Sequence, residues 1–306
     1  MKHGVLLLHK PTGMTSSDLV RRIKPMVRPR KVGHTGTLDP MAEGLLPLTI
    51  GEATKLTRWL QAGDKRYQAT LKLGQATDTL DKEGRITEEK ALPTPLSPEK
   101  VESVLSTFRG PIQQVPPMFS ALHHKGKRLH ELARQGLEVE RPPRSVTIHA
   151  LELLSLDKDE LKLDVRCGSG TYIRSLGADI AIALGTVGHL TALKRTESCG
   201  WHLDDALRPD ELSPGNIDDD LLALPEVLKR FIQVQVPNSI GLHLSQGQRL
   251  GRDALRDLGV DLVAGSILCF STAAGAPYIL AELKAEDDEP AMDILRVLIP
   301  RDQQKH

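Results

Sequence analysis

Apolar and polar residues alternate in several short stretches of this chain, a pattern typical of strands that bury one face. The alternation is clearest in three stretches, at residues 67–73, 146–150 and 161–167. A continuous apolar run at Val5–His9 predicts a fully buried strand. The chain therefore contains strands of both kinds, half-buried and fully buried.

Helix signals occur at three places between these strands. Ser16 or Ser17 can cap a helix that runs to about Lys24, where Pro25 favours a stop or a kink. Ser97-Pro98-Glu99 begins a second helix, and residues 170–184 form a third. Strands and helices follow one another without a regular βαβ order, which predicts an α+β fold with a mixed or antiparallel central sheet and flanking helices.

Changes in composition predict the domain organisation. Prolines and an acidic run near residues 205–230 suggest a boundary between a larger domain, residues 1–210, and a small C-terminal domain, residues 231–306. Short strand-like pieces in the C-terminal part predict a small β-barrel. They lie at residues 232–236, 262–263, 267–270, 278–280 and 294–298. Residues 111–145 are polar, basic and rich in proline, and predict an inserted arm.

Charge and cysteine content narrow the classes of function. The net charge is zero, yet residues 1–150 carry 24 Lys and Arg against 15 Asp and Glu, whereas the remainder carries 16 against 25. A basic half suits a polyanionic partner, although its densest run, residues 21–31, can equally be a solvated helix face and linker. Three well-separated cysteines without CxxC spacing predict a reducing, cytoplasmic setting and no zinc site. We see no apolar run of about 20 residues, so no membrane span is expected.

The segment from Gly33 to Gly44 is the richest in candidate chemistry, with three glycines, His34, Asp39 and Glu43 within twelve residues. The glycines allow close approach of the backbone, and Pro40 restricts both itself and the preceding Asp39. A carboxylate on such a stiff turn is well placed to act on a ligand. An ordinary surface turn has a similar composition, so composition alone leaves both interpretations open.

Read in full, the segment 33–44 resembles the GHxGxLDPxAxG catalytic motif of the TruB-type tRNA pseudouridine synthases. Five further segments resemble other motifs of that family and occur in the family's order: residues 10–16, 64–81, 115–121, 170–175 and 193–196. The resemblance implies an α+β fold with a cleft across the sheet, and a C-terminal PUA-like RNA-binding domain. It implies isomerisation of the uridine at position 55 in the T loop of tRNA, by base flipping and without a cofactor.

The resemblance also implies catalytic roles. Asp39 is the expected nucleophile; Glu43 is the alternative carboxylate, but it lies beyond Pro40. Tyr67, one of nine aromatic residues, is expected to stack on the uracil and to move a proton, although a core tyrosine on a strand is the plain alternative. Arg174 is the expected ion-pair partner of Asp39, against the alternative of a surface arginine that opens a helix.

Four more residues are expected to bind the substrate. Tyr172 and Leu193 would line the base pocket, or they could be ordinary core residues. His34 would fill the space left by the flipped nucleotide. Lys10 would support the active-site loop or contact a phosphate, and a solvated lysine is the alternative. We find no metal-ligand spacing around His34, so no metal is expected.

The expected partner is therefore the T-stem loop of tRNA, bound by a monomer without guide RNA. Three other functions compete with this one. A tRNA-folding chaperone would bind the T arm and release it unchanged. A carboxylate glycosidase would need a second catalytic carboxylate, which the sequence does not supply. A guide-RNA-dependent rRNA pseudouridine synthase shares the motifs, but this chain lacks basic tails.

Overall fold

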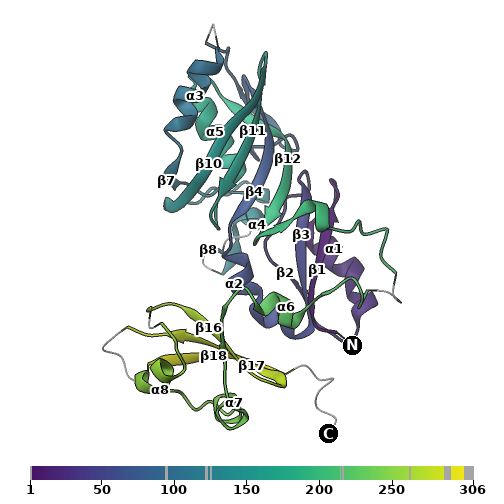
Figure 1. The fold of residues 1–306 in the computed structure, drawn as a ribbon. Coiled ribbons are helices and arrows are strands. Elements are labelled where there is room, and N and C mark those ends of the chain that lie inside the picture. Colours follow the sequence, from purple (N-terminus) through teal and green to yellow (C-terminus); the bar gives the residue numbers. More distant parts are fainter. Residues whose placement is uncertain are drawn as a thin grey trace.

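The computed structural model describes residues 2–93, 96–120, 123–124, 126–213, 215, 217–261, 263–285 and 291–299. They form a large body around a ten-stranded sheet and a smaller body around a four-stranded sheet (Figure 1). The larger body holds the N-terminus and the smaller one the C-terminal strands.

The large sheet is mixed, as the irregular order of elements predicted. Strands β12 and β3 are parallel, and all other strand pairs of this sheet are antiparallel. The main path is, in order, β14 (Leu222–Ala223), β1 (Gly4–Lys10), β3 (Glu43–Ile50), β12 (Gly188–Ser198), β4 (Lys65–Leu73), β11 (Glu160–Cys167), β10 (Arg144–Asp157) and β7 (Gly110–Gln114), with β2 (Val32–His34) beside β3 and β13 (Trp201–His202) beside β12.

Helices α3 (Pro98–Ser106) and α5 (Ile173–Ala183) pack on one face of this sheet (Figure 1). Strand β4 shows why. Its alternate residues are buried, among them Ala69, Leu71 and Leu73, and they join the main core with residues of α5. The predicted alternation at residues 67–73 is therefore confirmed. A short hairpin, β5 (Gln75–Thr77) with β6 (Ile86–Glu89), follows β4.

Helix α1 (Ser16–Ile23) begins one residue earlier than the serine signal indicated, because Thr15 is its N-cap. The hydroxyl of Thr15 accepts the N–H of Asp18 at 3.0 Å, and the Asp18 carboxylate accepts the N–H of Thr15 at 3.2 Å. This reciprocal capping box satisfies two free backbone donors. A 3₁₀ turn, η1 (Lys24–Val27), follows at Pro25, where the sequence predicted a break.

The inserted arm is shorter than the predicted range 111–145. Residues 110–114 and 144–148 pair as β7 and β10 in an antiparallel ladder at the sheet edge. In this ladder Ile112 lies opposite Val146. The segment outside the sheet is therefore residues 115–143. Its described part contains β8 (His123–His124), β9 (Lys127–Arg128) and α4 (Leu129–Arg134).

The C-terminal part forms a sheet, but its described residues do not close into the predicted barrel. The order is β15 (Ile232–Gln235), β16 (Ile267–Thr272), β17 (Gly275–Leu283) and β18 (Met292–Leu298), so β15 and β18 lie at opposite edges. The segment between β15 and β16 forms α7 (Asn238–Ser245) and α8 (Arg252–Asp257) instead of strands. Of the predicted piece 262–263, residue 262 lies outside the described residues and Val263 lies in no strand.

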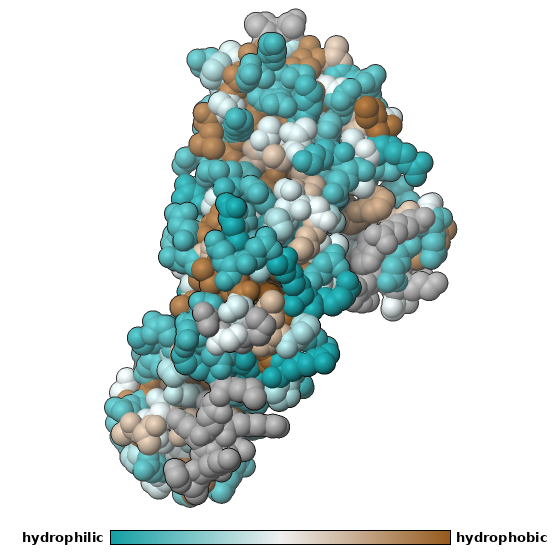
Figure 2. Space-filling view, turned by 90° about the vertical axis from the view of Figure 1, so that its right-hand side faces the viewer, coloured by the Kyte–Doolittle hydropathy of each residue, from teal (hydrophilic) through white to brown (hydrophobic). Residues whose placement is uncertain are grey.

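An apolar core joins the two bodies. It packs residues of η2 (Gly51–Leu56), α2 (Thr57–Gln61) and α6 (Leu224–Leu228) against the small sheet. Leu56 and Leu60 belong to the same buried cluster as Leu280 and Leu298. Helices α2 and α6 lie between the two sheets in Figure 1. Figure 2 shows hydrophobic residues at the surface near the junction of the two bodies. A further 3₁₀ turn, η3 (Leu203–Asp205), follows β13.

Candidate active site

A cavity of about 560 Å³ lies beside the turn that carries Asp39, a volume within the usual range of small-molecule sites. Five parts of the chain contribute to its walls: the turn 36–39, helix α2, strand β4, strand β12, and the start of α5. Its lining includes Asp39, Arg58, Lys65, Tyr67, Tyr172, Arg174, Leu193 and Arg195.

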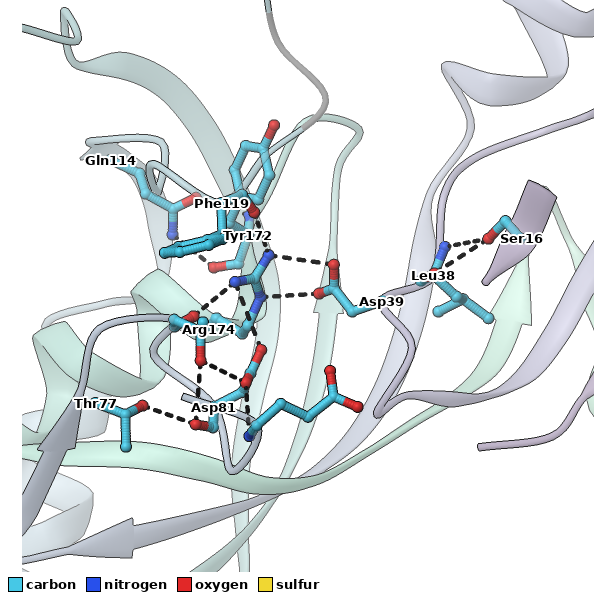
Figure 3. A network of polar contacts seen from close by, with 11 residues as sticks. Ser16, Leu38, Asp39, Thr77, Asp81, Gln114, Phe119, Tyr172 and Arg174 are labelled. Atoms are coloured by element: carbon cyan, nitrogen blue, oxygen red, sulfur yellow. Dashed lines mark hydrogen bonds and ion pairs between the residues drawn. The ribbon is translucent and has the colours of Figure 1, made fainter. Parts of the chain in front are cut away.

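The turn that carries Asp39 is fixed from both sides. The buried hydroxyl of Ser16 accepts the N–H of Leu38 at 2.8 Å and contacts the Leu38 carbonyl at 3.1 Å (Figure 3). The far end of the turn depends on Gly44, whose φ is +112° and whose position leaves no room for a Cβ, since that atom would lie 2.3 Å from the Arg195 carbonyl. Helix α1 and strand β12 thus hold the carboxylate in place.

Arg174 holds the Asp39 carboxylate through a two-point ion pair. Its Nε donates to Asp39 Oδ2 at 2.8 Å and its Nη2 to Oδ1 at 3.2 Å (Figure 3). The Arg174 side chain is 4% exposed and that of Asp39 is 32% exposed, so the carboxylate faces the cavity while the guanidinium lies behind it. The pairing predicted from the sequence is therefore present, in the fork geometry that suits a carboxylate.

Three further acceptors fix the guanidinium itself. It donates to the carbonyls of Thr79 at 2.6 Å and Phe119 at 2.7 Å, and its Nη1 lies 3.6 Å from Oδ2 of Asp81. Asp81 is 4% exposed and accepts the Thr79 hydroxyl at 2.6 Å. Asp81 was not among the residues predicted for the site, although its place in the motif segment 64–81 could have identified it.

Tyr67 lies on β4 with 6% of its surface exposed, and it lines the cavity beside Arg195. Burial raises the pKa of its phenol to about 12. The hydroxyl is therefore protonated at neutral pH, and it can donate a proton but is a poor base.

Two buried cations on the cavity wall were not nominated from the sequence. Arg195 is fully buried and donates to the carbonyls of Leu45 at 2.7 Å and Gly36 at 3.2 Å. Lys65 donates to the carbonyls of Gln61 and Gly63 at 2.8 and 2.7 Å, and burial lowers its pKa. Arg195 lies in segment 193–196 and Lys65 in segment 64–81, both of which resemble family motifs. Their position in a motif could therefore have identified them as site residues.

The four predicted substrate-binding residues divide into two pairs. Tyr172 and Leu193 line the cavity, and Gln114 holds the Tyr172 backbone through bonds of 3.0 and 2.8 Å. Lys10 and His34 are not part of the cavity lining. His34 lies on β2, where burial and the nearby Arg195 lower the pKa of its imidazole.

Lys10 supports the turn next to Asp39. It is fully buried, and its Nζ donates to the carbonyls of Pro11 at 2.9 Å and Met14 at 2.6 Å. Burial lowers the pKa of its ammonium to about 8, against the opposing attraction of Asp39. In this structure Lys10 is therefore buried and bonded to a neighbouring loop and not solvated, while its expected role toward the substrate stays a prediction.

Glu43, the alternative carboxylate, lies on a neighbouring cavity of about 300 Å³ and not on the one that Asp39 lines. Its Oε2 is 3.6 Å from Nε2 of His9. Asp39 is therefore the better candidate for the reacting carboxylate.

Among the described residues, no three His, Cys, Asp or Glu side chains come together as a metal site. Within the same part of the chain, no helix is long and apolar enough to cross a membrane.

The basic run before the active-site turn is partly neutralised. Three of its arginines form ion pairs with aspartates, two of which come from the acidic segment after residue 205. The pairs are Arg21 with Asp18, Arg22 with Asp210 and Arg30 with Asp218. On the arm, Lys125 and the side chains of Lys127 and Arg128 lie outside the described residues.

Comparison with known proteins identifies the class to which this fold and site belong. A solved structure of a Cbf5-Nop10-Gar1 complex shares the fold, with a TM-score of 0.71 at 23% identity, over 98% of this chain and 86% of that one. A model described as "TruB family pseudouridylate synthase (N terminal domain)" matches residues 24–173. The matching family model is thus one of pseudouridylate synthases.

Sequence relatives identify the family within that class. A protein named "tRNA pseudouridine synthase B" from Azoarcus sp. is 46% identical over 250 residues, which are 81% of this chain and 83% of that protein. One of the same name from Nitrosococcus oceani is 44% identical over 255 residues, 80% and 82% of the two chains. The chain belongs to the TruB family.

Proposed function

We propose that this protein isomerises uridine to pseudouridine at position 55, in the T loop of tRNA. The observation that carries the proposal is the Asp39 carboxylate, held by the buried Arg174 at the wall of a cavity that Tyr67 also lines. The relatives' shared name, tRNA pseudouridine synthase B, supports tRNA as the substrate.

The reaction breaks the N1–C1′ bond of uridine, turns the base, and joins C5 to C1′. C5 then loses a proton and N1 gains one, so electrons and atoms balance without a redox partner or a cofactor. These steps require a carboxylate at the junction of sugar and base, and a second group that moves a proton. Asp39 takes the first role, because its oxygens face the cavity while Arg174 fixes their orientation.

Tyr67 is the second participant. Its ring offers a stacking surface for the uracil, and its hydroxyl, which burial keeps protonated by raising its pKa to about 12, can donate a hydrogen bond or a proton to the base or the sugar. The cations Arg195 and Lys65 on the same wall give the cavity a positive lining. That lining suits a nucleotide whose phosphates remain nearby.

A base inside a folded RNA must leave its stack to enter a cavity of this kind. Unpaired loop nucleotides can be extruded at lower cost than paired ones, which favours a loop as the target. Tyr172 and Leu193 line the cavity and would form the apolar part of the pocket for the extruded base. His34 lies outside that lining on β2, and we expect it to fill the space that the base leaves. The proposed enzyme acts as a monomer and without guide RNA.

The arrangement argues against a two-carboxylate glycosidase. Such an enzyme places two carboxyl groups on either side of the reacting bond. The second carboxylate near Arg174 is Asp81, which is buried behind the guanidinium and does not line the cavity.

The test is a direct assay of isomerisation. The purified protein is incubated with an unmodified tRNA transcript labelled with tritium at uridine C5, without ATP, metal or guide RNA. We expect tritium release and one pseudouridine in the T loop. The matched control, Asp39→Asn, preserves size and should release no tritium. A wild-type protein that binds this tRNA but releases no tritium would show that it is a binding protein only.

A further inference from the structure

Two arginines from different bodies of the protein share one tryptophan. The guanidinium carbon of Arg58, on α2, lies 3.9 Å from the centroid of the Trp59 ring. That of Arg296, on β18 of the small sheet, lies 5.9 Å from the same ring. Both distances fall within the range of a cation–π contact. One indole therefore brings a cation of the large body near a cation of the small one.

The position of α2 places Arg58 at the cavity. Arg58, Gln61 and Ala62 line the cavity from one side of the α2 segment, as residues spaced by three and four positions do on a helix. Leu60 faces the other way, into the apolar core shared with the small sheet. The Arg58 side of α2 thus faces the substrate cavity while its opposite side anchors the C-terminal body.

The junction holds Arg296 in a fixed relation to α2. The ammonium of Lys55 donates to the Val297 carbonyl at 3.1 Å, and the N–H of Ile299 donates to Glu52 at 3.1 Å. These polar contacts flank the apolar core that includes Leu298. The residues that follow Arg296 are therefore tied to the segment that carries Trp59.

Neither guanidinium is neutralised within the described part of the chain. Arg58 has no carboxylate within ion-pair distance there, and Arg296 donates only to the Leu295 carbonyl, at 2.6 Å. Both residues are exposed. A guanidinium stacked on a ring still presents its N–H edge, which matches the oxygens of a phosphate. Two such cations on one ring repel each other, and an anion between or beside them removes that cost.

We propose that Arg58 and Arg296, held on Trp59, form a composite phosphate-binding site across the two bodies, and that it contacts the RNA backbone next to the nucleotide in the cavity. The inference rests on the proposed function for the identity of the RNA. It assigns the C-terminal body a specific role: it supplies one of the two cations, Arg296, while the other, Arg58, lines the catalytic cavity.

The test measures the salt dependence of tRNA binding. Arg58→Gln and Arg296→Gln are compared with wild type, and Arg256→Gln is the matched control. Arg256 is an exposed arginine of the same small body that pairs with Asp253 on α8. Dissociation constants for an unmodified tRNA transcript are measured at several salt concentrations, and thermal melts confirm that each variant is folded.

Each of the two site variants should weaken binding about tenfold and lower the salt slope by about one unit, because each loses one charged contact to a phosphate. The double variant should lose less than the two effects combined, since the cations share one site. Trp59→Leu should reproduce part of both losses, and Trp59→Phe should retain more affinity than Trp59→Leu. The Arg256→Gln control should bind as wild type does.

The proposal would be overturned if the salt slopes of Arg58→Gln and Arg296→Gln equalled the salt slope of the Arg256→Gln control. A loss in Arg58→Gln alone would also overturn it, because the site would then not span the two bodies. Tritium release by the wild type is recorded in parallel. A protein with the expected slopes but no release would retain the phosphate site while disproving the proposed isomerase function.

Discussion

Replacing Arg174 by glutamine should destabilise the fold and stop turnover, and the structure gives the size of the first effect. The guanidinium serves two carboxylates, those of Asp39 and Asp81, and two backbone carbonyls. Removing one partner of a buried ion pair costs about 3–5 kcal/mol, because the remaining charge stays desolvated. Asp39 is 32% exposed and can be rehydrated, but Asp81 is almost fully buried. We therefore expect a loss near 4 kcal/mol in the free energy of unfolding.

Thermal and urea unfolding measure this loss, and about 4 kcal/mol corresponds to a fall of roughly 10 °C in Tm for a protein of this size. Arg174→Lys keeps the charge but cannot fork between two oxygens, so it should lie between glutamine and wild type. The matched control is Arg22→Gln, which removes an exposed ion pair with Asp210 and should cost less than about 1 kcal/mol.

Turnover of Arg174→Gln, assayed well below its Tm, should fall at least about 100-fold, because the carboxylate loses its fixed orientation. Asp81→Asn is a useful comparison, since it disturbs the same network away from the cavity and should reduce turnover less. If Arg174→Gln unfolds within 1 kcal/mol of wild type, as the Arg22→Gln control should, the ion pair does not hold the site together and this reasoning is wrong.

Three further variants test other parts of the site. Asp39→Asn should bind tRNA within a few-fold of wild type while it loses isomerisation, because affinity comes mostly from phosphate contacts; a large binding defect in a titration would contradict this. Tyr67→Phe should lower turnover more than affinity, whereas Tyr67→Leu should also lose about 1–3 kcal/mol of stacking; equal turnover for Phe and Tyr would remove the hydroxyl from the chemistry. Lys10→Met tests the buried ammonium. The folded-state pKa of Lys10, about 8, lies below its ordinary value of 10.5, so the unfolded chain binds more protons between these values and wild-type stability should rise with pH there. Relative to Lys10→Met, the gain in unfolding free energy from pH 8 to 10.5 should be on the order of 3 kcal/mol, and parallel pH profiles of the two proteins would contradict it.

The sequence alone determined the elements whose signals are local. Alternation fixed β4, because burial of one sheet face imposes a spacing of two on residues 67–73. The Ser97-Pro98 start of α3 depends on a cap that involves adjacent residues only. The ordered motifs also determined the family and the pairing of Asp39 with Arg174, residues 135 positions apart.

Only the tertiary structure decided which of the remaining charged residues meet. Asp81 lies behind Arg174, and Arg195 and Lys65 wall the cavity, because strands distant in sequence are brought side by side in the sheet. The short arm and the open C-terminal sheet have the same cause. Residues 110–114 join the large sheet, whereas β15 and β18 do not pair with each other, and both outcomes depend on long-range strand pairing that local composition does not encode. The contact of Arg296 with Trp59 depends on how two bodies dock, and no periodicity along the chain records that geometry.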